Sequence, residues 1–212
     1  MDPDIEIINQ NTRIEKIKNF FLKNLKKILI ILLSFILIVF GYFLLLDIKK
    51  KSKAKIAQDY NRIVSKYEKE KTKDFQNQLI EIINKKDPTY SILALYFLLD
   101  NKILDDKKKI NELFDILIEK TQIDKEIKNL VIYKKALFNS DSISENELLS
   151  LLKPIINSES VWKGHSLYLL AEFFYAKNEK SKSKEFFNQI INLKEVNSNL
   201  KLEAQKKLNR DF

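Results

Sequence analysis

The stretch that decides the fold is residues 28–46, ILIILLSFILIVFGYFLLL, nineteen residues without a charged side chain or a proline. As an α-helix this stretch would be roughly 28 Å long, which matches the hydrocarbon thickness of a bilayer. Sixteen of its residues are Ile, Leu, Val or Phe. At about −0.3 to −0.6 kcal/mol each, they give an insertion free energy on the order of −5 to −10 kcal/mol. The stretch therefore predicts one transmembrane helix.

Two other interpretations of this stretch are less consistent with its pattern. A helix in the core of a soluble protein normally keeps a polar face, which residues 28–46 lack. A cleaved signal peptide has an apolar region of about 7 to 15 residues that ends in small residues. Here the apolar region is longer and runs directly into Asp47 and a lysine cluster. We therefore expect an uncleaved anchor.

The rest of the chain is expected to be all-α. Two glycines and three prolines in 212 residues leave little turn chemistry for a sheet protein. Residues 1–27 would form a short head whose second half is an amphipathic helix. Residues 47–87 would hold a juxtamembrane linker helix, over 52–71, and the first domain helices. Residues 88–212 would form helical repeats, closed by a capping helix.

Charge is concentrated beside the anchor. The net charge is +9, but residues 56–212 hold 27 basic against 24 acidic residues, a net charge of only +3. Arginine, the residue that best grips phosphate, occurs only three times. We therefore expect no nucleic-acid partner. The juxtamembrane lysines are expected to contact lipid headgroups: Lys49, Lys50, Lys51, Lys53 and Lys55.

Apolar spacing predicts three helix pairs after Pro88, followed by a last helix. Ser144 and Glu147 have the spacing of a capping box at the start of one of these helices. The predicted pairs are 90–100 with 107–119, 125–138 with 145–156, and 162–176 with 181–193, and the last helix is 199–208.

The third pair carries a tetratricopeptide-like pattern. Its first helix follows the W-x2-L-G-x2-Y template with Leu167, Leu170, Ala171 and Phe174. Its second helix follows A-x3-F with Ser183 and Phe187. The corresponding small residues of the first two pairs are Ala94 and Ala136. Ala94 lies 42 residues before Ala136, and Ala136 lies 35 residues before Ala171 of the third pair. These spacings deviate from the regular repeat of 34. The sequence favours a TPR-like solenoid of helical hairpins, and an irregular helical bundle is the alternative.

Three stretches resemble one known family. They are IEKIKNFFLKNLKK at 14–27, PTYSILALYFLLDN at 88–101, and 161–187, which begins VWKGHSLYLLAEFFYAKNEK. Each is similar to a segment of the YfgM-like ancillary subunits of the bacterial SecYEG translocon, which are membrane-anchored proteins with a tetratricopeptide-like domain. The high lysine content and the bulky second pair depart from that family.

The resemblance implies a single-pass protein of the bacterial inner membrane, with a cytoplasmic head and a periplasmic domain. Its partners would be the Sec translocon and periplasmic chaperones or their clients, and it would link secreted chains to those chaperones. The lysines on the two sides of the anchor are too similar in number to set the orientation. A membrane-anchored cytosolic scaffold for assembly of a membrane complex is therefore the alternative. A structural subunit that binds lipid through its lysines is a third hypothesis.

No catalytic pattern is present in the sequence. His165 is the only histidine, cysteine is absent, and two glycines cannot supply a Gly-rich phosphate loop. We expect no enzyme activity, no cofactor, no metal and no small-molecule substrate. The residues expected to bind protein share one side of the first helix in the second and third pairs, although they could instead be partly buried packing residues: Tyr133, His165, Tyr168, Glu172 and Tyr175.

Overall fold

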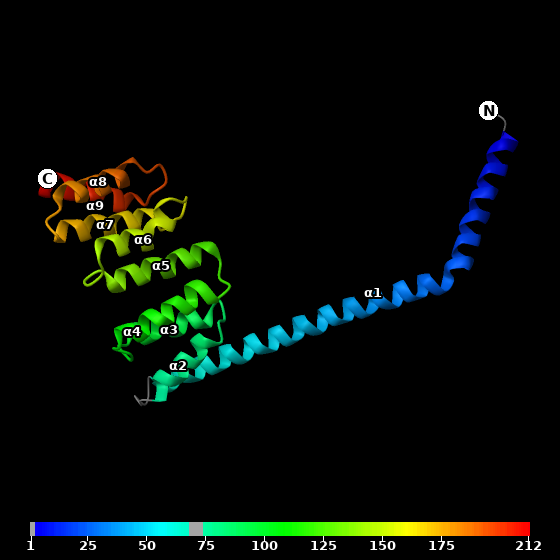
Figure 1. Ribbon diagram of the computed structural model, residues 1–212, viewed down its shortest axis with the longest axis horizontal. Coiled ribbons are helices and arrows are strands. Elements are labelled where there is room, and N and C mark those ends of the chain that lie inside the picture. Colours follow the sequence, from blue (N-terminus) through cyan, green and yellow to red (C-terminus); the bar gives the residue numbers. More distant parts are fainter. Residues whose placement is uncertain (1–2, 68–73) are drawn as a thin grey trace. The chain divides into compact units, whose positions relative to one another are not determined.

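The computed structural model describes the backbone of residues 3–67 and 74–212, and the side chains of residues 14–27, 29–67 and 74–212. Within these ranges every regular element is a helix (Figure 1), which confirms the all-α prediction. The elements are α1 (Pro3–Tyr67), α2 (Asp74–Asn84), α3 (Tyr90–Asp100), α4 (Lys107–Asp115), the π-helical turn η1 (Ile116–Lys120), α5 (Lys125–Asn139), α6 (Glu145–Ile156), α7 (Lys163–Ala176), α8 (Lys180–Asn192) and α9 (Ser198–Asp211).

The first helix is longer than its sequence pattern predicts. The head was expected to be helical only in its second half, but α1 begins at Pro3, a residue suited to the first helical position, and runs on for 65 residues. It contains the apolar stretch, whose described side chains are exposed. The described part of the chain thus has one helix that is long and apolar enough to cross a membrane. The predicted linker helix reached residue 71, and its last four residues lie outside the described ranges.

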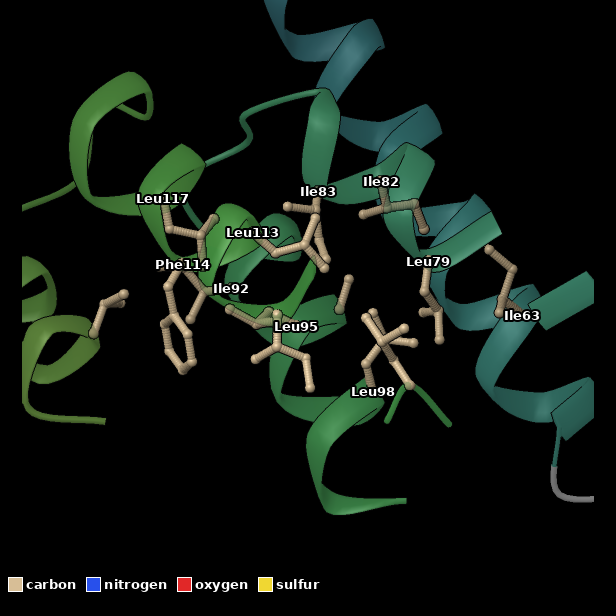
Figure 2. Close-up of a cluster of buried hydrophobic side chains, with 14 of the residues drawn as sticks. Ile63, Leu79, Ile82, Ile83, Ile92, Leu95, Leu98, Leu113, Phe114 and Leu117 are labelled. Atoms are coloured by element: carbon tan, nitrogen blue, oxygen red, sulfur yellow. The ribbon is translucent and has the colours of Figure 1, made fainter. Parts of the chain in front are cut away.

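The chain divides into two compact units, Met1–Lys55 and Ile56–Phe212. The second unit is the helical domain, and its first hydrophobic core joins the end of α1 to α2, α3, α4 and η1. Leu79, Ile83 and Leu95 are fully buried there, and Ile63 of α1 is 3% exposed. Figure 2 shows these side chains converging, Ile63 from α1, Leu79 and Ile83 from α2, and Leu95 from α3. The core therefore starts with the amphipathic part of α1, as the sequence spacing predicts.

The first predicted helix pair is wrong in its partner, because α3 packs most closely against α2 and not against α4. Small residues on α3 explain the close approach: Ser91 Oγ donates a hydrogen bond to the Ile82 carbonyl at 2.9 Å, and Ala94 is fully buried. α3 and α4 share the same core through large side chains such as Leu95 and Phe114. Large buried side chains hold helix axes further apart.

The second and third predicted pairs are confirmed, since α5 packs against α6 and α7 packs closely against α8. In the α7–α8 pair the Ala171 side chain is fully buried. The Ser183 hydroxyl donates to the Ala171 carbonyl across the helix contact at 2.8 Å. Small residues at 171 and 183 thus let the two helices approach, as the tetratricopeptide-like pattern requires.

The ends of the helices follow local chemistry. The capping box at the start of α6 is confirmed: the Ser144 hydroxyl accepts from the Glu147 N–H, and the Glu147 carboxylate accepts from the Ser144 N–H. The predicted helix 107–119 ends differently, because its last turn is the π-helical η1. Thr121 closes that turn by donating its hydroxyl to the Ile116 carbonyl at 3.0 Å.

Replacing Ala171 by leucine tests the close approach of α7 and α8. Three extra carbons at a fully buried position are expected to lower the free energy of unfolding by about 1 to 3 kcal/mol. Urea unfolding of the detergent-solubilised protein, followed by circular dichroism, measures the change. Ala176→Leu, at the exposed end of the same helix, is the control and should change stability by less than about 0.5 kcal/mol. Equal effects of the two variants would contradict the packing.

Candidate protein-interaction site

Three aromatic rings from two neighbouring helix pairs form a cluster. The Tyr133 ring on α5 stacks on the Trp162 ring, with centroids 5.9 Å apart and planes 19° apart. The His165 ring on α7 lies 5.7 Å from the Trp162 centroid and 6.1 Å from the Tyr133 centroid. Two of the five predicted binding residues, Tyr133 and His165, are therefore brought together by a third aromatic residue that was not on the predicted list.

A cleft of about 800 Å³ opens beside this cluster. One wall is the α6–α7 loop and the start of α7, with Val161, Trp162 and His165, and the other wall is the α8–α9 loop, with Leu193 and Val196. The Val161 side chain is 74% exposed at its edge. Volumes of this size are typical of binding sites. The cleft thus offers apolar and aromatic surface that an incoming side chain can cover.

Charge around the cleft is balanced. Lys163 and Lys194 lie in its lining together with Glu159 and Glu195. None of these four charged groups forms an ion pair with a described side chain. The rim can therefore pair with charges of either sign on a partner, while the walls favour an uncharged side chain.

The loop that carries Trp162 is held by one carboxylate. Glu126 Oε2, in the first turn of α5, accepts a hydrogen bond from Ser160 Oγ at 2.7 Å and from the Val161 N–H at 3.1 Å. The other oxygen of Glu126 accepts from the Asn129 amide at 3.3 Å. Ser160 Oγ in turn accepts from the Trp162 N–H at 3.2 Å. This network fixes the start of α7 relative to α5, and so fixes the aromatic cluster.

The opposite wall depends on Gly164. A Cβ at this position would lie 2.7 Å from Val196 Cγ2 and 3.0 Å from Leu200 Cδ2. Both distances are shorter than normal van der Waals contact. The absence of a side chain therefore lets the α8–α9 loop lie against α7, which sets the width of the cleft.

The other three predicted binding residues lie elsewhere and are contacted by α8, α9 and Phe212. The Tyr168 ring packs edge-on against Phe187 on α8, at 5.5 Å. The Tyr175 ring packs against Phe212, at 5.7 Å. The Glu172 carboxylate pairs with Lys207 of α9 at 2.8 Å. These residues are half-buried, and α9 restricts the access of a partner to them.

The Tyr133 and Tyr168 phenols stay neutral at physiological pH. Burial raises the pKa of Tyr133 above its usual value of 10. Burial also raises the pKa of Tyr168, with a further contribution from the nearby Glu172 carboxylate. The hydrogen bond to Glu172 raises the pKa of Lys207. The Tyr133 and Tyr168 hydroxyls can therefore donate hydrogen bonds to a partner but do not supply charge.

A second hollow, of about 390 Å³, lies between α4, α5 and α6. Two of its polar groups already satisfy each other: the Asn111 amide donates to Asn139 Oδ1 at 3.0 Å, and the Asn139 amide donates to Asn111 Oδ1 at 2.7 Å. Lys135 at its edge pairs with Asp115 at 2.5 Å. Because these groups are occupied within the chain, we place the candidate site at the aromatic cleft.

The five lysines predicted to contact lipid are all exposed on α1. Lys51 pairs with Asp47 at 2.7 Å, one turn away. Both side chains of that pair are more than half exposed, at 77% and 55%, so the pair contributes little to stability. The lysine cluster is thus accessible to lipid headgroups.

Sequence reasoning missed Trp162, Val161 and Glu126 as site residues. The available signal was that Trp162 is the only tryptophan, and tryptophan is enriched at protein interfaces. No local sequence pattern identifies Glu126 as a site residue, because its hydrogen-bond partners in the loop lie 34 and 35 residues away in the sequence. Among the described residues no group of His, Asp or Glu side chains is arranged to hold a metal ion.

Comparison with known proteins gives no family assignment: no family model matches the chain, and no curated protein or solved structure shows significant similarity to it.

Glu126→Ala tests the network that positions the aromatic cluster. The substitution leaves the buried Ser160 hydroxyl without its acceptor, so the free energy of unfolding should fall by about 1 to 3 kcal/mol. Because Trp162 is the only tryptophan, its emission should also shift to longer wavelength as the loop loosens. Glu119→Ala, at an exposed residue of η1, is the matched control. Unchanged emission in Glu126→Ala would show that the carboxylate does not hold the loop.

Proposed function

We propose that this protein is a non-enzymatic, membrane-anchored protein-binding module, ancillary to the Sec translocon, that links secreted chains to periplasmic chaperones. The observation that carries the binding proposal is the open cleft walled by Trp162 and His165 in an all-helical domain. Aromatic side chains beside an exposed aliphatic residue are typical of protein interfaces. The Sec and chaperone partners come from the resemblance of residues 14–27, 88–101 and 161–187 to the YfgM-like family.

Contacts between alternate helices support a TPR-like solenoid. Lys134 of α5 lies over the Tyr96 ring of α3, at 5.9 Å. Tyr133 of α5 contacts His165 of α7, and Glu172 of α7 pairs with Lys207 of α9. The helices α5, α7 and α9 therefore contact one another in series, and α5 and α7 are the first helices of the two confirmed pairs. Such a series is typical of stacked hairpins, whose first helices line one binding surface.

The anchor proposal rests on α1. The described side chains of its apolar stretch are exposed. Water would be a costly environment for so much apolar surface, at about 25 cal/mol per Å². A bilayer removes this cost and leaves the backbone hydrogen bonds satisfied within the helix. We propose a single pass through the bacterial inner membrane, with the head in the cytoplasm and the domain in the periplasm.

One observation favours the alternative function, a membrane-anchored cytosolic scaffold. The five exposed lysines directly after the apolar stretch follow the rule that basic residues flank the cytoplasmic side of a span. The head carries basic residues in similar number, so charge leaves the two orientations balanced.

Cysteine labelling distinguishes the two orientations, because the natural chain has no cysteine that would react. In spheroplasts, an impermeant maleimide should label Lys201→Cys, at an exposed residue of α9. It should label Lys16→Cys only after the membrane is permeabilised. The reverse pattern would support the cytosolic scaffold. Labelling of both residues in material released by alkaline carbonate would contradict a membrane anchor.

Site-specific photocrosslinking tests the binding surface. A photoreactive residue at Val161, on the edge of the cleft, should capture secretory chains during their translocation and lose them when translocation is blocked. A Trp162→Ala background should reduce the yield by about tenfold or more, because central aromatic anchors contribute about 2 kcal/mol or more to binding. The same photoreactive residue at Leu202, 54% exposed on α9, is the control. Equal capture from both positions would exclude the cleft as the binding surface.

A further inference from the structure

The first turns of α1 whose side chains are described, residues 14–27, have two different faces. Ile14, Ile17, Phe21 and Leu25 recur at helical spacing. Their side chains are 63%, 59%, 53% and 47% exposed, so no other described part of the first compact unit covers this apolar face. The opposite face is polar and mostly basic: Glu15, Lys16, Asn19, Lys23, Lys26 and Lys27. The remaining lysine, Lys18, lies at the edge of the apolar face.

The charge of this segment matches an anionic surface. Residues 14–27 carry five lysines and a single glutamate, a net charge of +4. None of these lysines forms an ion pair with a described side chain, and all five are exposed. Basic helices with one apolar face typically lie in the interface of a membrane, with the lysines reaching the phosphates.

The segment also lies at the right place along the chain, because it leads directly into the apolar stretch 28–46. Figure 1 shows that α1 is bent in its early, blue part, within the first compact unit. The Asn24 side-chain amide donates to the Phe20 carbonyl at 2.9 Å, a carbonyl that also serves the backbone ladder of an ideal helix. A bend lets one part of a helix follow the membrane plane while the next part crosses it.

We propose that residues 14–27 lie in the plane of the membrane and bind anionic phospholipid. The apolar line through Ile17 and Phe21 enters the acyl-chain boundary, and the lysines on the other face bind headgroup phosphates. The proposal rests on the membrane anchor of the proposed function, and it adds a second, lipid-specific contact on the other side of the span from Lys49–Lys55.

Single-cysteine spin labelling of the full-length protein in vesicles tests the proposal, again because the chain has no natural cysteine. The vesicles are phosphatidylcholine with about one-third phosphatidylglycerol, a level at which each lysine near the surface contributes a factor of about five. Labels at Ile17→Cys and Phe21→Cys should be accessible to dissolved oxygen and protected from a water-soluble nickel complex. Labels at the matched positions Asn19→Cys and Lys23→Cys should show the opposite.

Two further measurements isolate the lipid and the charge. The protection of Ile17→Cys and Phe21→Cys should be lost in pure phosphatidylcholine. It should also be lost when Lys16, Lys26 and Lys27 are replaced by glutamine. Three exposed lysines of the helical domain, Lys125, Lys184 and Lys201, give a control with the same change in net charge when replaced by glutamine, and this control should keep the protection.

A label at Leu37→Cys, in the middle of the apolar stretch, separates the two proposals. If Leu37→Cys is in lipid and all four head positions are in water, the surface helix is overturned and the anchor stands. If Leu37→Cys is in water as well, the anchor and the surface helix both fall. Protection of the head that is equal with and without phosphatidylglycerol would overturn the preference for anionic lipid.

Discussion

The carboxylate of Glu126 is the interaction on which the candidate site depends. It joins the start of α5 to the loop before α7, two parts of the chain separated by more than thirty residues, through Ser160 and the Val161 N–H. With that loop fixed, the Trp162 ring can stack on Tyr133, and α7 can present His165 beside it. Gly164 then admits the α8–α9 loop on the other side. The cleft therefore depends on the polar network of Glu126 and on the glycine at position 164, and not on the apolar cores alone.

Much of the fold could be predicted from the sequence, because local chemistry specifies it. The apolar stretch 28–46 lacks any residue that would stop a helix, and α1 runs through it. Ser144 and Glu147 form the predicted capping box. The small residues Ala171 and Ser183 meet where α7 and α8 pack together. In each case the residues that decide the structure are close in sequence or follow one helical period.

The errors come from contacts that no local pattern encodes. Ala94 was correctly identified as a small packing residue, but its helix, α3, packs against α2 and not against the predicted α4. The sequence does not specify which neighbouring helix packs against a face of small residues. The residues of the predicted binding face on α7 likewise contact different parts of the domain. His165 joined the aromatic cleft, while Tyr168 and Tyr175 were engaged by Phe187 and Phe212. Spacing along one helix gives a common side, but only the arrangement of α8 and α9 decides how much of that side is open.

The position of α9 has a consequence for assembly. A stack of helix pairs exposes an apolar surface at its end, to which the first pair of another molecule could add, and repeated addition would give a filament. In this domain α9 lies on that surface and buries Leu200 and Ala204 against the last pair. Its exposed side chains are mostly polar or charged, with Leu202 as an exception. The last pair is thereby covered by a helix with a mostly polar outer surface, which disfavours the end-to-end addition of a second copy at this face.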